Sequence, residues 1–564
     1  MEAGRRPGRM TVLPVPSAEP EPFDPAPAGG GLRAEPRWLG RATWAFVGLG
    51  VVLRVAMYGL DFPLWWDEAF VAVNLLRRGY LDLLRPLDYG QVCPLLFLWA
   101  ELAAARLLGF SEWSLRLFPL GCAVAGVFLF RAMARQVVRG RAELIAVAVL
   151  AVSVHPIRHA ADLKPYATDL LAAVVLQGLA LGWLRDRGRP GRLWGLAGFV
   201  PFALLASHPA AFVAGGVGAA LAWPAWRSGR RGVRSAFLAY GLAMMATSAW
   251  VYVGFTRAQA SASGPGMGMM WARSFPPLDS PLGLVRWLAT VHTGDMLAYP
   301  CGGERGASTL GLGLAIAGAV AIGRRGRFAA LGVLVGPLGL ALIAAALRRY
   351  PYGGPAPHGS AARVMQYAAP GLCLLIGVGA ASLLARVGSD RLRGRITRIG
   401  LSALIVIGLV PIVEGARHPY RAYQAQAARE FARRFWPEVG SGAEVACLRW
   451  DLGVAEWDSV RLGIAVATCN QAIESPSRRA GGPDYRKVSA GHPLRCVLAA
   501  APERDGPEVE AWLNGMAARF DLRSRATVVY DAAEPGRRPV PERFEVFEFV
   551  PRAGPGQPPA SIGP

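Results

Sequence analysis

Eleven apolar stretches run through the 564-residue chain, and short arginine-rich segments separate many of them. Several are shorter than the ~20 residues that cross a bilayer, so we expect their helices to extend into flanking residues. Only 18% of the residues are charged, against about 25% in an average soluble domain. The pattern predicts an all-α polytopic membrane protein with about eleven transmembrane helices, at residues 42–60, 115–131, 142–156, 167–184, 193–206, 209–225, 235–255, 308–323, 328–347, 364–385 and 399–413.

The basic residues are concentrated between these stretches. The formal net charge is +22, and only Lys164 and Lys487 among the 61 basic residues are lysines. Because the arginine clusters alternate with membrane helices instead of lining one soluble face, we expect no nucleic-acid partner. Five clusters follow the first apolar stretch, at 131–141, 185–192, 227–234, 324–327 and 386–398.

One further apolar segment, Val92 to Gly109, decides the predicted topology. It carries Glu101 and Arg106 and begins beside a proline. If this segment does not cross the membrane, all five arginine clusters lie on the same side as the N-terminus, and the positive-inside rule makes that side cytoplasmic. If the segment crosses, all five clusters lie outside the cell, against the rule. We therefore predict that it lies along or re-enters the outer interface of a cell (inner) membrane. The extracytoplasmic segments are then 61–114, 156–166, 256–307, 348–363 and the chain from about 414.

Composition divides the chain into four predicted parts. Residues 1–36 have no apolar run and predict a disordered cytoplasmic tail, and 553–564 a second disordered tail. Residues 37–415 form the transmembrane domain, and 416–552 an extracytoplasmic α/β domain without a catalytic motif. In that domain we expect helices near Tyr420–Trp436 and 507–520, and strands at 443–450, 494–500, 526–530 and 543–550.

The first outer segment contains an acidic pair next to two tryptophans: Trp65, Trp66, Asp67 and Glu68, followed by an amphipathic helix through Leu76. In the simplest interpretation Asp67 caps the N-terminus of that helix and the tryptophans anchor at the membrane interface. The alternative is a carboxylate in an outward-facing site. The residues alone leave both interpretations open.

Four motifs that follow one another along the chain favour the second interpretation, a carboxylate in an outward-facing site. They are WWDEAF (65–70), YGQVCPLLFLWAELAAARLLGFSEWSLRLFPL (89–120), HPIRHAADLKPY (155–166) and YPYGGPAPHGSAARVMQYAAP (350–370). This order resembles the GT-C membrane glycosyltransferases, which include the protein O-mannosyltransferases and the lipid A aminoarabinose transferase-like enzymes. The resemblance covers about 40–200 well, 345–375 more thinly, and the C-terminal part not at all. Its G-x-x-E-x-x-x-R-L-x-P pattern is matched by Gly109, Glu112, Arg116, Leu117 and Pro119.

The resemblance implies an inverting hexosyl- or pentosyltransferase. It would move a sugar from a polyprenyl-phosphate donor to an extracytoplasmic lipid, glycan or protein acceptor. Such chemistry needs a carboxylate to take a proton and cations to hold the phosphate. The candidates are Asp67, Glu68 and Asp162 for catalysis; Lys164, Arg363, Arg158 and His358 for the phosphate; and Trp66, Tyr166, Tyr350 and Tyr352 for the sugar or acceptor.

Roles within this set are ordered but not fixed. Asp67 is the preferred base, and Glu68 is the alternative base or an orienting neighbour, with burial beside the tryptophans favouring a raised carboxyl pKa. Asp162 would orient the acceptor or contact a metal. The competing interpretation of each arginine is a snorkelling anchor, and of each tyrosine an interfacial belt residue.

The sequence predicts no metal site from histidine spacing and no certain cofactor, although a divalent metal is left open. The rival function is a non-enzymatic membrane protein, such as a lipid or polysaccharide transporter or a scaffold of the same fold. Transporters tend to carry ionisable groups in mid-helix and to show inverted repeats. Here the helices are nearly free of acids, and this favours the transferase.

Overall fold

The computed structural model describes residues 36–262, 271–294, 296–302, 307–356, 359–420, 423–439, 442–448, 487–500, 510, 513–530 and 542–552. Apart from Pro36, the two predicted tails lie outside the described residues. Helices make up most of the described chain up to Arg417.

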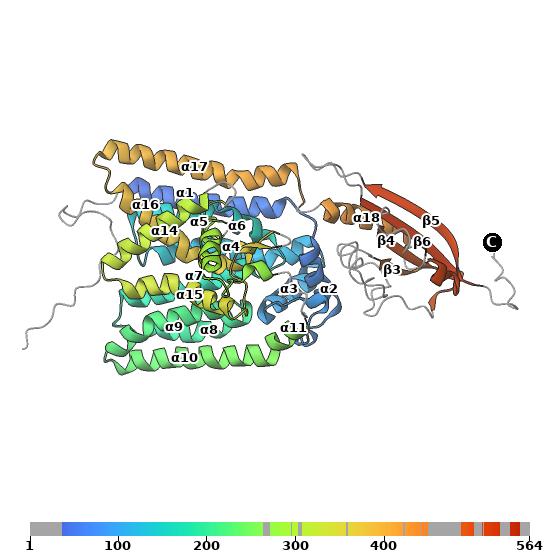
Figure 1. Ribbon diagram of the computed structural model, residues 1–564, viewed down its shortest axis with the longest axis horizontal. Coiled ribbons are helices and arrows are strands. Elements are labelled where there is room, and N and C mark those ends of the chain that lie inside the picture. The colour runs from blue at the N-terminus through green and yellow to red at the C-terminus, as the bar shows by residue number, and fades with distance from the viewer. Residues whose placement is uncertain are drawn as a thin grey trace, which may run out of the picture.

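The helices lie side by side in one bundle, with the C-terminal sheet at one end (Figure 1). We call the end beside the sheet, where α2 and α3 lie, the outer end, and the opposite end, where the arginine clusters lie, the arginine end. The helices are α1 (Arg37–Gly59), α2 (Trp66–Arg77), α3 (Leu95–Leu108), α4 (Glu112–Ala134), α5 (Gly140–Val152), α6 (Val154–Arg158), α7 (Tyr166–Arg185), α8 (Gly191–Ala206), α9 (Ala210–Arg227), α10 (Arg231–Val251), α11 (Arg257–Ala262), α13 (Pro281–Thr293), α14 (Ala307–Arg324), α15 (Phe328–Ala346), α16 (Ala369–Leu384) and α17 (Asp390–Arg417).

All eleven predicted stretches lie in helices, but fewer helices qualify as spans. Seven described helices are long and apolar enough to cross a membrane, and the α5–α6 pair, bent by 49°, would be an eighth. The expected number of eleven is higher than this count. The three predicted stretches that are not among these candidate spans lie in α8, α9 and α14, which have 16, 18 and 18 residues. The seven are α1, α4, α7, α10 with its continuation to Ala262, α15, Ala362–Leu384 and α17.

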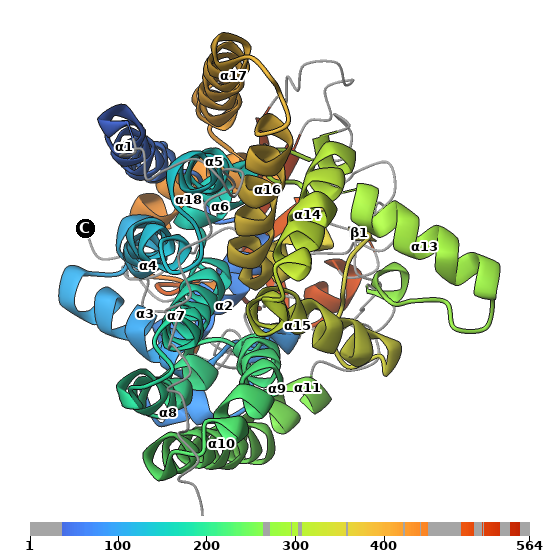
Figure 2. The ribbon, with the colours of Figure 1, turned by 90° about the vertical axis from the view of Figure 1, so that its left-hand side faces the viewer.

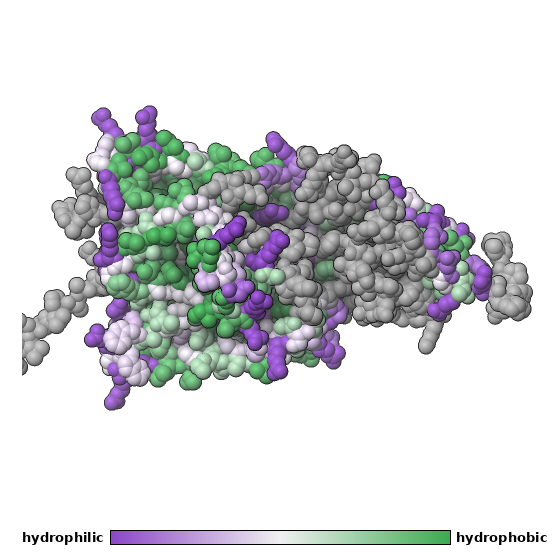
Figure 3. All heavy atoms as spheres, in the orientation of Figure 1, coloured by the Kyte–Doolittle hydropathy of each residue, from purple (hydrophilic) through white to green (hydrophobic). Residues whose placement is uncertain are grey.

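The bundle separates buried from lipid-facing helices. In α7 and in Ala362–Leu384, 78% of the apolar window is buried, against 17% in the peripheral α10 and α17. The end-on view places α17 and α10 at opposite margins of the bundle (Figure 2). Hydrophobic atoms cover the middle of the bundle and hydrophilic atoms gather at the arginine end (Figure 3). An exposed apolar belt of this kind requires lipid around it, so the chain is a multi-pass membrane protein.

Helix α3 lies where the topology argument needs a non-crossing segment. Its 14 residues extend about 21 Å, well short of the ~30 Å hydrocarbon core, and it is not among the candidate spans. Its Glu101 is fully buried. Burial, reinforced by the nearby Glu68 carboxylate, raises the pKa of Glu101 well above its usual value.

The C-terminal part contains helix α18 (Tyr423–Val439) and a four-stranded sheet of order β3-β4-β6-β5. The strands are β3 (Glu444–Leu448), β4 (Leu494–Ala500), β5 (Phe520–Tyr530) and β6 (Glu542–Pro551); β3 and β4 are parallel and the other pairs antiparallel. Helix α18 packs on the sheet, with the Phe431 and Phe544 rings stacked 4.4 Å apart. A two-stranded ribbon, β1 (Pro355–Ala356) with β2 (Gly359–Ser360), belongs to the preceding part of the chain.

The predicted elements of this part are largely present. Helix α18 and strands β3, β4 and β6 match the expected segments. Of the helix expected at 507–520, residues 513–517 are helical and most of the earlier ones lie outside the described residues. Strand β5 starts six residues earlier than expected, at Phe520, because it is an edge strand whose first half is exposed and has no apolar run.

The fold predicts which ends of the helices share one side of the membrane. With single cysteines introduced into a Cys447→Ser/Cys469→Ser background, Asp279→Cys in the segment before α13 should react with an impermeant maleimide added to intact cells. Arg189→Cys, between α7 and α8, should react only after permeabilisation, because α7 carries the chain across the bilayer. Labelling in the opposite order would contradict the predicted orientation.

Candidate functional site

The first turn of α2 carries both acids of the pair. Trp65 occupies the N-cap position, and its backbone N–H donates to Glu68 Oε2 at 3.3 Å. The interpretation of Asp67 as the N-cap residue is therefore wrong. A carboxylate in the first turn is favoured there by the positive end of the helix dipole, and the side chain that returns to the cap is that of Glu68.

Glu68 is buried in an ion pair with Arg116 of α4. Arg116 donates to Glu68 Oε1 at 3.1 Å and to Oε2 at 2.7 Å, and Glu68 itself has no exposed surface. The Leu163 N–H donates to the same Oε1 at 2.7 Å. Arg116 also donates to the carbonyl groups of Phe62 and Pro63. This one pair thus connects α2, α4, the segment before α2 and the segment before α7.

Asp67 makes a different set of contacts. Lys164 Nζ donates to Asp67 Oδ1 at 2.8 Å and to Gln91 Oε1 at 2.7 Å. Arg363 NH1 lies 4.0 Å from Asp67 Oδ2. The Asp67 side chain keeps 27% of its surface exposed, whereas those of Lys164 and Arg363 keep 7% and 12%. A carboxylate and two cations from three distant segments therefore meet at the outer end, with the carboxylate the most accessible of them.

Two tryptophans pack against Arg363, which lies in the 3-10 helix η7 (Ala361–Ala368). Its guanidinium lies 5.3 Å from the ring centre of Trp65 and 5.6 Å from that of Trp271. The Tyr350 hydroxyl donates to the Val364 carbonyl at 2.9 Å. Cation–π contacts of this length favour a fixed guanidinium position, so these groups hold Arg363 beside Asp67.

The two cations determine the charge of Asp67. Burial raises its pKa, but the charges of Lys164 and Arg363 and the Lys164 hydrogen bond outweigh burial, and the pKa of Asp67 is lowered below its usual value. A raised carboxyl pKa, as expected beside the tryptophans, is therefore not found for Asp67. The cause is Lys164, which lies 2.8 Å away and whose proximity the sequence did not reveal. Asp67 is ionised at neutral pH.

Asp162 has a separate partner. Its Oδ2 lies 2.6 Å from Nδ1 of His159, and both side chains are buried. The His159 ring packs edge-on against Tyr166 at 5.1 Å and stacks on His155 at 6.0 Å. The negative charge of Asp162 also acts on Asp67 and opposes its ionisation.

The structure places two of the other predicted residues on different elements. Arg158 is exposed on α6. The buried Tyr352 lies with its hydroxyl 3.1 Å from His292 Nε2. His358 and the side chain of Trp66 lie outside the described residues. Among the described residues, no group of three or more His, Cys, Asp and Glu side chains is placed to hold a metal ion.

The C-terminal part reaches the site through α18. Arg429 donates to the Asp61 backbone carbonyl at 2.7 Å, and its NH1 also lies 3.4 Å from Asp61 Oδ2 and 3.9 Å from Glu112 Oε1. Asp61 has a φ of 47°, in the left-handed region that residues other than glycine rarely adopt. Arg429 therefore binds the chain at a sharp bend just before the acidic pair.

Sequence reasoning missed three residues that the structure brings to the site. Gln91 was only part of the second motif, and its contact with Lys164 left no separate signal. Trp271 lies in a segment without a motif, and Arg429 in a domain where we expected no site residue. Arg116 was identified only as a member of the family pattern. These residues act through contacts between distant segments, which a single sequence does not reveal.

Comparison with known proteins gives distant likenesses only. No protein-family model and no curated protein matches the chain. Among solved structures, it resembles ArnT from Cupriavidus metallidurans bound to undecaprenyl phosphate, at 12% identity and a TM-score of 0.49, covering 90% of this chain and 97% of that chain. It also resembles the Archaeoglobus fulgidus oligosaccharyltransferase in the apo form, at 11% identity and a TM-score of 0.46, covering 88% and 74%.

With TM-scores below 0.5 the likenesses are too weak to assign a function, which has to come from the residues of the site.

The buried pair predicts that Glu68 and Asp88 respond differently to removal of charge. Glu68→Gln leaves the Arg116 charge buried without a counter-ion, and we expect it to lower the free energy of unfolding by about 3–5 kcal/mol. The measurement is equilibrium unfolding of the purified protein in mixed micelles. Asp88→Asn, which breaks the partly exposed Arg78–Asp88 pair in the same outer segment, should cost less than about 1 kcal/mol. Equal losses would contradict the anchoring role of Glu68.

Proposed function

We propose that the chain is a membrane glycosyltransferase that moves a sugar from a polyprenyl-phosphate donor to an acceptor on the outer side of a cell (inner) membrane. The single observation that carries the proposal is the group formed by Asp67, Lys164 and Arg363 at the outer end of the bundle. A carboxylate next to two cations is what transfer from a sugar phosphate to a hydroxyl or amine requires. The order of the sequence motifs supports the same reaction class.

In the proposed reaction the acceptor attacks the anomeric carbon from the face opposite the phosphate. Its proton passes to the Asp67 carboxylate, while the bond from the anomeric carbon to the phosphate oxygen breaks and its electron pair stays on the phosphate. Lys164 and Arg363 stabilise the charge that builds there. Because the phosphate is a good leaving group, no general acid is needed. Displacement from the opposite face inverts the anomeric centre.

The contacts of Asp67 with Lys164 and Arg363 also explain how a bound donor would make Asp67 a stronger base. Lys164 and Arg363 now hold the pKa of Asp67 low, which makes it a weak base. A bound phosphate would share both cations and bring its own negative charge, and both effects raise the pKa of a nearby carboxylate. Asp67 would then become a stronger base only when the donor is in place.

We assign supporting roles to the remaining candidates. Glu68 acts as the orienting neighbour, because its two oxygens are already bonded to Arg116, Leu163 and Trp65. Asp162, held by His159, is the candidate to orient the acceptor. Tyr166, Tyr350 and Tyr352 are candidates to line the sugar or acceptor site, and Tyr350 also supports the η7 segment next to Arg363.

The first prediction for this site is loss of transfer in Asp67→Asn. We expect the rate with a suitable member of a panel of polyprenyl-phosphate sugars to fall at least about 100-fold, because the amide cannot take the proton. The assay uses purified protein in lipid. The matched control is Asp82→Asn, the same chemical change at an exposed position of the same outer segment, which should retain full activity.

Two results would contradict the proposal in different ways. An active Asp67→Asn variant would move the base to Glu68 or Asp162. Binding of the donor without transfer across the panel, with acceptors of lipid, glycan and protein class supplied, would favour the transporter or scaffold function.

The second prediction concerns pH. The carboxylate of Asp67 is the active form and is lost as pH falls through its pKa, so a pKa below the ordinary aspartate value should keep kcat/KM constant from pH 8 down to about pH 5. In Lys164→Gln, burial of Asp67 is opposed only by Arg363, its pKa rises, and the acidic limb of the profile should move to higher pH. The measurement is kcat/KM for transfer between pH 4 and pH 8.

Lys487→Gln provides the control, because it removes the other lysine of the chain, which lies in the C-terminal part. Its profile should superimpose on that of the wild type. An acidic limb that stays in place in Lys164→Gln would show that Asp67 is not the group that titrates in the reaction.

A further inference from the structure

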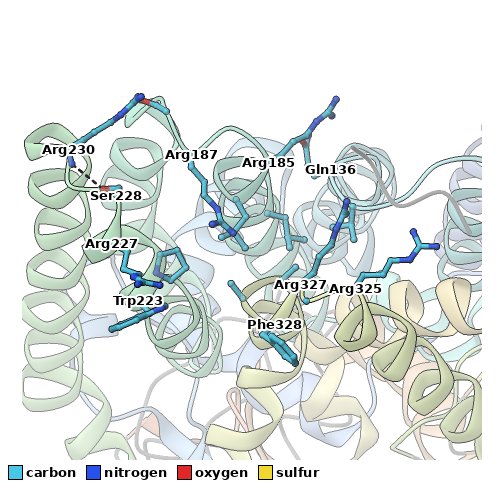
Figure 4. A pocket seen from close by; sticks show the side chains of 18 residues that line it. Gln136, Arg185, Arg187, Trp223, Arg227, Ser228, Arg230, Arg325, Arg327 and Phe328 are labelled. Carbon is cyan, nitrogen blue, oxygen red and sulfur yellow. Dashed lines mark hydrogen bonds between the residues drawn. The ribbon is translucent and has the colours of Figure 1, made fainter. Parts of the chain in front are cut away.

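A cleft at the arginine end, away from the site, is lined by six arginine residues. Its volume is about 820 Å³, within the range of about 300–1,000 Å³ typical of ligand pockets. The six arginines come from three separate connections between helices. They are Arg185, Arg187, Arg227, Arg230, Arg325 and Arg327. In Figure 4 the side chains of Arg187 and Arg227 lie at the hollow, whereas those of Arg185 and Arg325 point away from it.

The lining of the cleft is positively charged. Among the described residues that line it there is no Asp or Glu. Asp186, in the α7–α8 connection, is not one of the lining residues and lies 3.7 Å from Arg189. Arg327 is half-buried, and burial together with the charge of Arg325 lowers its pKa. Like charges held together in this way favour a bound anion.

The backbone keeps the arginines in place without a ligand. Arg230 NH1 donates to the Gly188 carbonyl at 2.7 Å, which joins the α9–α10 connection to the α7–α8 connection. Gly326, at φ +68°, forms the tight turn between α14 and α15, and its N–H donates to the Gly323 carbonyl at 2.8 Å. This turn places Arg325 and Arg327 on either side of one glycine. The arginine positions are therefore determined by the helix connections.

Part of the cleft lining is apolar. Leu181 and Leu184 of α7 belong to it, as do Trp223 and Phe328, whose rings lie below Arg227 and Arg327 in Figure 4. These two rings are 67% and 69% exposed, and they lie where the apolar belt meets the arginine end. Arg227 lies over the Trp223 ring at 5.0 Å. Guanidinium groups above exposed apolar surface match an amphiphile with an anionic head and acyl chains.

We propose that this cleft is a binding site for the phosphate headgroup of an anionic membrane lipid. The arginines bind the phosphate, for which guanidinium has the matching planar donors, and the acyl chains extend along the exposed apolar wall. A free phosphate ion would use the same donors but not the apolar wall. The bound lipid joins the three helix connections at the end of the bundle opposite the proposed active site.

The test measures lipid bound to the purified full-length protein by native mass spectrometry during titration with phosphatidylglycerol or with phosphatidylcholine of the same acyl chains. The wild type should bind one phosphatidylglycerol at least about tenfold more tightly than phosphatidylcholine. In Arg187→Gln/Arg227→Gln/Arg327→Gln the affinity for phosphatidylglycerol should fall at least about tenfold. The control Arg391→Gln/Arg395→Gln/Arg398→Gln removes the same charge from exposed positions of α17 and should bind like the wild type.

The same affinity for both lipids, or an equal loss in both triple variants, would overturn the proposal, because general attraction to the basic surface would then explain the binding. The last comparison repeats the lipid titration in the presence of inorganic phosphate. If the phosphate saturates the cleft and abolishes the preference for phosphatidylglycerol, the site belongs to a free anion and the lipid assignment is wrong. Should the triple variant not fold, the single variants Arg187→Gln and Arg227→Gln are compared with Arg395→Gln, and a loss confined to the first two supports the site.

Discussion

The site depends on the buried ion pair between Glu68 and Arg116. Burying two charges is costly unless their remaining donors and acceptors are satisfied. Here Glu68 also accepts from the backbone of Trp65 and Leu163, and Arg116 donates to carbonyl groups of the segment before α2. Four segments are therefore fixed relative to one another. Asp67 and Lys164 are the chain neighbours of Glu68 and Leu163, so the pair also determines where the accessible carboxylate and its cation meet.

The two adjacent acids, Asp67 and Glu68, take different roles. Glu68 is fully buried and bonded on both oxygens, whereas the Asp67 side chain keeps 27% of its surface exposed between two cations. The helix dipole favours an acid at either position of the first turn. What separates them is the geometry of the helix, because successive residues face different directions. One acid is directed at Arg116 and the other at Lys164.

The distribution of arginine gives the bundle two chemically different ends. At the outer end Arg116, Arg363 and Arg429 each have a carboxylate within 4 Å. At the other end six arginines line a cleft that has no carboxylate among its described lining residues. Helix α7, about 30 Å long, carries Tyr166 at the first end and Arg185 at the second. Arg429 extends the outer network into α18, so the C-terminal part contacts the bend at Asp61 directly.

The sequence by itself determined the class of fold, because apolar runs and arginine-rich connections depend only on local composition. It identified the helices, the short non-crossing segment around α3, the strands with apolar runs, and Asp67, Lys164 and Arg363 as candidates. The tertiary structure alone decided that these three meet, that Trp65 and not Asp67 is the N-cap residue, and that Asp67 has a lowered pKa. It also added Gln91, Trp271 and Arg429 to the site. The reason is that each of these facts depends on the distance between side chains that lie far apart in the sequence.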